Sequence, residues 1–174
     1  MASATPALNH VALTVDQAIL KGPKREALKD FLGSVFGWEE IPQLTNDGKR
    51  LVFRLYRRGQ FLYLVSGKRP SELQGADHFG IEVSNRATLN RMVAAAKRFK
   101  KKDPGVQIID TKVNTETPTL RLWNAYVRYL LPLMVEVQFY EEKMAAPAAK
   151  PKRRVVRKVA SLKRAKRTSR ARAA

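Results

Sequence analysis

Cysteine is absent from the 174-residue chain, which excludes disulfides, thiolate metal sites and cysteine nucleophiles. Histidine is scarce, with His10 and His78 as the two examples. No apolar run approaches the length of a membrane span, and the longest, 130–135, is six residues and contains Pro132. The N-terminal residues lack the charged and apolar regions of a secretory signal. We therefore expect a cytoplasmic protein.

Acidic residues are missing from one part of the chain. Residues 145–174 contain 12 Lys and Arg and no Asp or Glu, whereas the preceding 144 residues hold 22 basic and 15 acidic side chains. The overall net charge of +19 thus divides into +7 for the first part and +12 for the last. With 44% hydrophobic residues overall, the sequence indicates a mildly basic globular domain that carries a strongly basic tail.

The tail, residues 145–174, is rich in Lys, Arg and Ala and has no aromatic residue. Such a segment buries too little apolar surface to offset the entropy of ordering, so we expect it to be disordered. A run of like charge binds nucleic acid without reading its sequence, by releasing condensed counterions. Association with the nucleoid is the corresponding expectation, and a purely solubilising tail or a basic helix on an anionic membrane surface are the alternatives.

Hydrophobic periodicity before the tail predicts one order of elements twice. The first unit is a strand, a helix that ends at Gly37, and two strands joined by a tight turn at Arg58-Gly59; the second is a strand, a helix capped by Ser84 or Asn85, and three strands. The predicted ranges are strands 8–15, 49–57, 60–66, 78–83, 106–113, 120–129 and 133–140, and helices from 24 to 36 and from about 85 to 102. Residues 67–75 form the predicted linker, and Trp38 is expected in the core.

Side chains alternate between an apolar and a mixed face along the predicted strands. In the opening strands, Val11, Leu13 and Val15 oppose His10, and Phe79, Ile81 and Val83 oppose His78. In the last strand, apolar neighbours lie on the face opposite Glu136. We therefore expect the two helices to cover the apolar faces, leaving a polar face that carries three potential metal ligands.

The repeat, with His10 in LNHVALTV, His78 in GADHFGIEV and Glu136 in LMVEVQFYE, resembles the vicinal oxygen chelate superfamily, which includes glyoxalases, bleomycin-resistance proteins, fosfomycin-resistance enzymes and extradiol dioxygenases. The resemblance implies an α+β fold in which two βαβββ modules, about 8–66 and 76–140, form a curved mixed sheet with helices on its outer face. The domain spans residues 7–143. Family members commonly form homodimers, and residues 130–133 are the expected contact.

The resemblance places metal ligands at His10, His78 and Glu136, and the family's fourth position falls on Tyr63, where a carboxylate is usual. Two imidazoles and one carboxylate suit Fe(II) or Mn(II) with a bidentate oxygen substrate. Independently, Glu136 lies in an apolar run, where a cation would offset the cost of burying its charge. The alternative is an ordinary ion pair with Arg128 or Arg54.

Arg54, Tyr63 and Tyr126 are the expected catalytic residues, because an arginine and two tyrosines beside a metal suit an anionic or aromatic substrate with vicinal oxygens. The leading hypothesis is a metal-dependent enzyme, either an extradiol-type dioxygenase or a lyase or transferase acting on a small molecule. Two alternatives remain open: a metal-free ligand-binding dimer that resembles bleomycin-resistance proteins, and a nucleic-acid-associated scaffold.

Overall fold

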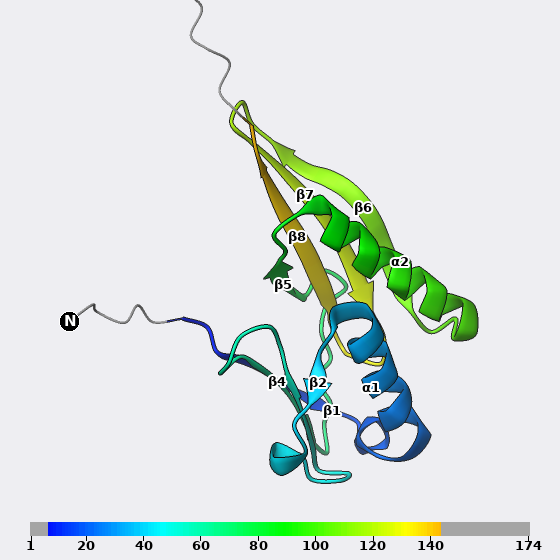
Figure 1. Ribbon diagram of the computed structural model, residues 1–174. Helices are drawn as coiled ribbons and strands as arrows, with labels where there is room; N and C mark the ends of the chain where they lie inside the picture. Colours follow the sequence, from blue (N-terminus) through cyan, green and yellow to red (C-terminus); the bar gives the residue numbers. More distant parts are fainter. Residues whose placement is uncertain (1–6, 144–174) are drawn as a thin grey trace, which may run out of the picture. The chain divides into compact units, whose positions relative to one another are not determined.

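Two modules of the same topology follow one another along residues 7–143, the part of the chain that the computed structural model describes (Figure 1). Each module folds into its own four-stranded mixed sheet. The predicted pair of βαβββ modules is therefore confirmed. The tail, and with it the predictions of disorder and of nucleic-acid binding for 145–174, lies outside the described residues.

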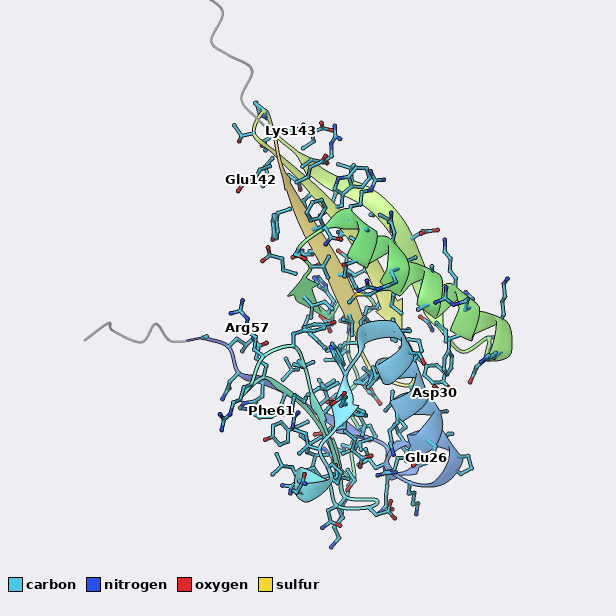
Figure 2. All side chains as sticks on the ribbon, in the orientation of Figure 1. Glu26, Asp30, Arg57, Phe61, Glu142 and Lys143 are labelled. Carbon is cyan, nitrogen blue, oxygen red and sulfur yellow. The ribbon has the colours of Figure 1, made fainter. Side chains whose placement is uncertain are left out.

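The first module contains β1 (His10–Val15), α1 (Gly22–Phe36), β2 (Glu39–Glu40), β3 (Arg50–Arg54) and β4 (Phe61–Ser66). Short 3-10 helices at Gln17–Leu20 and Pro42–Leu44 lie between these elements. The strand order is β1-β4-β3-β2, with β1 parallel to β4 and the other pairs antiparallel. Figure 2 shows Arg57 and Phe61, at the β3–β4 hairpin, on the side of this sheet away from Glu26 and Asp30 of α1.

The second module contains β5 (His78–Glu82), α2 (Arg86–Lys102), β6 (Gln107–Glu116), β7 (Leu120–Arg128) and β8 (Met134–Glu142). Its strand order, β5-β8-β7-β6, repeats the order of the first module, and β5 is parallel to β8. In both modules the opening strand is an edge with one hydrogen-bonded neighbour. The predicted mixed sheet thus consists of two four-stranded parts, because β1 and β5 each pair within their own module.

The helix ends follow from identifiable residues. Gly37 has a φ of 72° and ends α1, because glycine adopts the left-handed region without steric cost. Asn85 caps α2, and its side chain accepts a hydrogen bond from the Thr88 backbone N–H at 2.8 Å. Both of these predictions are confirmed. In contrast, α1 has Lys21 at its N-cap and no side-chain capping bond.

The two modules share one hydrophobic core between their helices and sheets. Phe31 of α1 lies at the seam, where its ring contacts Phe99 of α2 and Tyr129 after β7, with ring centroids 5.2 and 4.9 Å away. Trp38 is 2% exposed and stacks on Phe36, as predicted for a core residue. Because the apolar faces meet here, the opposite faces of both sheets carry the polar side chains.

Several boundaries differ from the sequence prediction. Strand β6 extends to Glu116 and β8 to Glu142, because their mostly exposed outer ends pair with β7 although they lack an alternating pattern. The two-residue strand β2 is too short for a periodic signal. Residues 130–133, the expected dimer contact, pack into the protomer's own core, with Leu131 6% and Leu133 7% exposed. No helix within residues 7–143 is long and apolar enough to cross a membrane.

Candidate functional site

Glu136 is the centre of a polar cluster on the second module. Glu136 lies on β8 and is 4% exposed, which is unusual for a residue with a carboxylate side chain. Asn124, on the neighbouring β7, donates its side-chain N–H to Glu136 Oε1 at 2.8 Å and to the Tyr126 hydroxyl at 3.1 Å. Neither arginine proposed as an alternative partner, Arg128 or Arg54, forms an ion pair with Glu136 within residues 7–143, where its ion-pair partner is His78. The Arg128 guanidinium donates to Gln107 and to the Pro132 carbonyl instead.

The cluster fixes the ionisation of its members. Burial raises the pKa of Glu136, but hydrogen bonds from Asn124, Tyr126 and Gln138, together with the charge of His78, outweigh burial and hold the pKa below its ordinary value. Desolvation, with the neighbouring Glu136 carboxylate, raises the pKa of Tyr126 to about 12. Near neutral pH the site therefore holds an ionised carboxylate beside a phenol that keeps its proton.

His78 presents a specific nitrogen to this carboxylate. Its Nδ1 lies 2.7 Å from the Ala76 carbonyl oxygen, and because a carbonyl can only accept, Nδ1 carries the proton. Its Nε2 lies 3.2 Å from Glu136 Oε2. A neutral His78 would thus point a lone pair at a carboxylate oxygen. A cation bound by both atoms would remove this repulsion.

The geometry of this pair fits a divalent ion. Two donors that each lie about 2.1 Å from one ion, at right angles, are about 3 Å apart, close to the separation of His78 Nε2 and Glu136 Oε2. Metal-bound histidines also donate their second ring N–H to a carbonyl or carboxylate, as His78 does to Ala76. The buried Asn124 Oδ1, which has no donor among residues 7–143, adds a further electron-rich atom to the cluster. The donor set therefore suits a cation.

Gly80 lies beside Glu136 and adds no side chain against its carboxylate. It lies two residues after His78 on β5 and pairs with Glu136 in the sheet register. A Cβ at this position would lie 3.6 Å from Glu136 Oε2, in ordinary van der Waals contact. The missing methyl group thus uncovers the carboxylate oxygen that faces His78. Strand alternation places Gly80 on the face of His78, but nothing in the sequence signals a role for it.

His10 lies apart from this cluster. Its Nδ1 donates to Asn9 Oδ1 at 2.8 Å, and its ring meets Tyr63 edge-on with centroids 5.5 Å apart. Within residues 7–143, no three His, Asp or Glu side chains lie close enough to hold one ion. The structure thus brings together His78 and Glu136 but not all three predicted ligands. The physical reason is that β1 and β5 are separate sheet edges, so the two histidines do not share a hydrogen-bonded framework.

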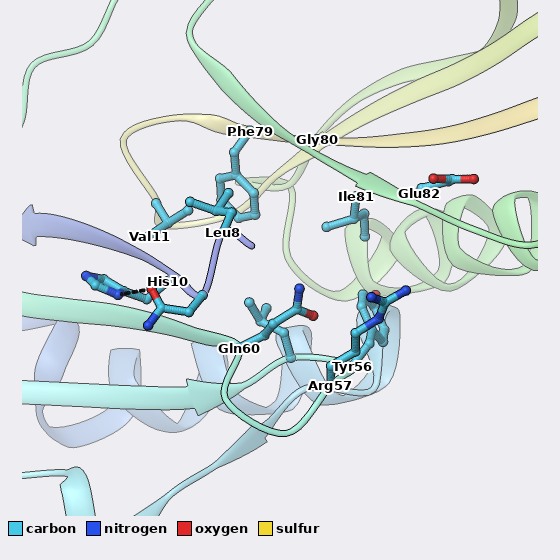
Figure 3. Close-up of a pocket in the computed structure, with 12 residues that line it drawn as sticks. Leu8, His10, Val11, Tyr56, Arg57, Gln60, Phe79, Gly80, Ile81 and Glu82 are labelled. Atoms are coloured by element: carbon cyan, nitrogen blue, oxygen red, sulfur yellow. Dashed lines mark hydrogen bonds between the residues drawn. The ribbon is translucent and has the colours of Figure 1, made fainter. Parts of the chain in front are cut away.

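A cavity of about 450 Å³ separates the two opening strands (Figure 3). His10 lies on one wall with the end of the β3–β4 hairpin, and Phe79, Gly80, Ile81 and Glu82 of β5 form the other. The cavity combines apolar groups with hydrogen-bonding ones. The cavity therefore lies between His10 and the strand that carries His78.

The predicted catalytic residues fall into two groups. Tyr126 belongs to the cluster, and its ring meets His78 edge-on at 5.3 Å. Tyr63 and Arg54 belong to the first module, where the Tyr63 ring contacts His10. Phe61 on β4 pairs with His10 on one side and with Arg54 on the other, so these three residues lie side by side across the sheet. Sheet register also makes Tyr63 the counterpart of Glu136, because Tyr63 pairs with Ala12 as Glu136 pairs with Gly80.

Comparison with solved structures finds the same architecture. A lactoylglutathione lyase from Agrobacterium tumefaciens matches with a TM-score of 0.52 and 19% identity, over 78% of this chain and 94% of that one. A glyoxalase/bleomycin resistance protein/dioxygenase from Alicyclobacillus acidocaldarius matches with 0.53 and 16%, over 75% and 89%. The fosfomycin resistance protein FosX from Listeria monocytogenes matches with 0.51 and 16%, over 81% and 96%.

No protein-family model matches the sequence, and no curated protein matches it by sequence. At these identities the structural matches define the fold. The chain shares the fold of these glyoxalase- and fosfomycin-resistance-type structures, which is the fold that the resemblance implied.

Proposed function

We propose that the protein is a metal-dependent enzyme in which His78 Nε2 and Glu136 bind one divalent ion, with His10 as the third protein ligand. The observation that supports this most directly is the 3.2 Å apposition of His78 Nε2 and Glu136 Oε2, with the other imidazole nitrogen tied to a carbonyl. Two imidazoles and a carboxylate favour Fe(II) or Mn(II) and leave positions for a substrate with vicinal oxygens. Such an ion supplies Lewis acidity.

The chain's own residues have distinct roles in this proposal. Asn124 orients Glu136, and the Ala76 carbonyl orients His78. Tyr126 holds a proton at its hydroxyl beside the cluster, because its pKa of about 12 keeps it protonated near neutral pH. Tyr63 and the exposed Arg54 supply a hydroxyl and a positive charge for an anionic or aromatic substrate. Extradiol-type ring cleavage and small-molecule lyase or transferase chemistry are the reactions that fit these groups.

The third ligand requires β1 and β5 to come together. Both strands are sheet edges with one neighbour, so a second copy of the chain can pair with them, and the proposal includes a homodimer. Mixing His10→Ala and His78→Ala proteins tests this. If the ligands come from different copies, exchanged dimers regain about a quarter of the native sites, by simple statistics of random pairing. If they come from one copy, mixing restores none.

Metal analysis of the purified full chain, followed by titration calorimetry with Mn(II), tests the centre itself. We expect one ion per chain and an affinity that falls at least about 100-fold in His78→Ala, because a direct ligand matters more than the neighbours that orient it. Glu142→Gln, an exposed change at the end of the same strand as Glu136, is the control and should leave the affinity unchanged. Equal affinity in His78→Ala would overturn the proposal.

A metal-free ligand-binding protein is the second candidate, and the cavity between His10 and β5 favours it. Five of its lining side chains are apolar, namely Leu8, Val11, Leu55, Phe79 and Ile81. Its volume of about 450 Å³ is in the range of small-molecule sites. A ligand that binds equally well to the His78→Ala protein and in the presence of a chelator would support this candidate over the enzyme.

Nucleic-acid binding by residues 145–174 remains a proposal that rests on their charge, 12 basic and no acidic side chains. Replacing the six Lys and Arg of 150–158 with Gln in the full chain should weaken binding to duplex DNA of arbitrary sequence. Binding that is unchanged by this substitution would contradict a role for the tail.

A further inference from the structure

The net positive charge of the folded domain is concentrated on one helix. Residues 1–144 hold 22 basic and 15 acidic side chains, and α2 alone contributes seven of the basic ones and none of the acidic. The remaining 15 basic residues balance the 15 acidic residues. Outside α2, this part of the chain is therefore electrically neutral.

The charged side chains of α2 are exposed, and most have no acidic partner. Lys97 pairs with Asp110, and the Arg86 guanidinium lies 3.5 Å above the Trp123 ring. The other five make no ion pair and no side-chain hydrogen bond with residues 7–143: Arg91, Arg98, Lys100, Lys101 and Lys102. Five cations are thus left to solvent along one helix.

Three of these cations form a row. Arg91, Arg98 and Lys102 are seven and four residues apart, so they lie on one face of the helix, about 10.5 and 6 Å apart along its axis at 1.5 Å per residue. Phosphates of one DNA strand recur about every 3.4 Å along the duplex axis. Because Arg and Lys side chains are long, a row of this length can reach several phosphates of one nucleic-acid backbone.

Helix stability accounts for part of this charge only. Lysines 100–102 lie in the last turn, where cations interact favourably with the helix dipole. Arg91 and Arg98 lie before that turn, so the dipole does not explain them. A lipid surface is a poor partner, because no large hydrophobic side chain of α2 is exposed to enter it, and its buried face contributes to the core.

We propose that the exposed face of α2 binds the phosphodiester backbone of a nucleic acid, with Arg91, Arg98 and Lys102 as phosphate contacts. This surface belongs to the folded domain and includes no residue of 145–174 and none of the His78–Glu136 cluster. The contacts are made to phosphates, so the surface binds without sequence preference. It gives the domain an interaction that does not depend on the proposed metal centre.

Fluorescence anisotropy with a 30-base-pair duplex of arbitrary sequence tests this surface in the full chain. We expect the triple variant Arg91→Gln/Arg98→Gln/Lys102→Gln to bind more weakly and to lower the slope of log affinity against log salt by about 2 to 3, at roughly 0.9 per lost phosphate contact. The matched control is Lys49→Gln/Arg58→Gln/Arg69→Gln, which removes the same charges from exposed positions of the first module and the linker that follows it and should change the slope far less.

Equal losses in the two triple variants would overturn the proposal, because they would show a response to net charge alone. An unchanged affinity in the α2 variant would overturn it as well. So would weaker binding to vesicles containing anionic lipid with no loss on the duplex. Circular dichroism checks that both variants are folded. Binding is measured in a chelator, so the result stays separate from that of the metal centre.

Discussion

The two modules share a topology but treat their opening histidines differently. In the second module, His78 is tied to a backbone carbonyl and faces a buried carboxylate. In the first, His10 is exposed, and the position equivalent to Glu136 is Tyr63. Both histidines meet a tyrosine ring edge-on at similar distances, 5.5 and 5.3 Å. One repeat therefore carries a buried carboxylate at this position, and the other carries a tyrosine.

The largest expected effect concerns whether the two modules fold as one unit. Phe31→Ala should destabilise the protein by about 3–5 kcal/mol, since it empties a buried position at the seam between α1 and α2. Urea unfolding followed by the fluorescence of Trp38 in one module and Trp123 in the other, each alone in a Trp→Phe background, measures this.

Both tryptophan signals should shift together in that experiment. Phe61→Ala, a half-buried change in the first module, is the control and should cost less than half as much. Separate transitions for the two tryptophans would show that the modules unfold independently, as two small domains.

Gly80→Ala tests whether the metal site lies on the second module. The added methyl group fits sterically but covers Glu136 Oε2, so metal affinity should fall about tenfold while the unfolding free energy changes little. Ala12→Gly makes the reverse change at the equivalent position of the first module and should leave metal affinity unchanged. Calorimetric titration with Mn(II) measures both, and equal affinities for the two variants would contradict a site on the second module.

The helix N-termini provide a smaller contrast. Asn85→Ala should destabilise the protein by about 1 kcal/mol, because it removes the bond to the Thr88 N–H. Lys21→Ala at the start of α1 removes no capping bond and should have almost no effect. Chemical denaturation of the two variants measures the difference, and equal losses would show that the cap is unimportant.

The smallest expected effect is a pH dependence in the second module. The Tyr129 hydroxyl, which donates to Asp103 at 2.5 Å, and the Gly105 N–H hold the pKa of Asp103 below its ordinary value of 3.8. This bond therefore stabilises the folded state above that value, and the contribution is lost as the pH falls through the lowered pKa. Thermal unfolding of Tyr129→Phe and of the parent should differ at pH 6 and converge on acidification. A difference that persists at low pH would point to lost packing instead.

Much of the fold was predictable because its determinants are local. Alternation in the opening strands predicted their buried faces, and Gly37 and Asn85 predicted the helix ends from single-residue chemistry. The spacing of His78 and Glu136 within their strands predicted that they share a face. Their contact was predicted through the resemblance, and the structure supplies the distance.

The separation of His10 from this pair was not predictable, because it depends on how the two sheet edges are arranged in space and not on any local pattern. The role of Gly80 was hidden for a related reason. A glycine in a strand gives no signal of what its missing side chain uncovers until the neighbouring strand is in place. The position of His10 and the role of Gly80 therefore both depend on packing between residues that are far apart in the sequence.

Diffraction from crystals soaked in Mn(II), with data collected for anomalous scattering, tests the central claim most directly. We expect a single strong anomalous peak bonded to both His78 Nε2 and Glu136 Oε2. The same crystals with no peak between these atoms, and the two groups still in direct contact, would show that a proton on His78 supplies the positive charge and would contradict the metal centre.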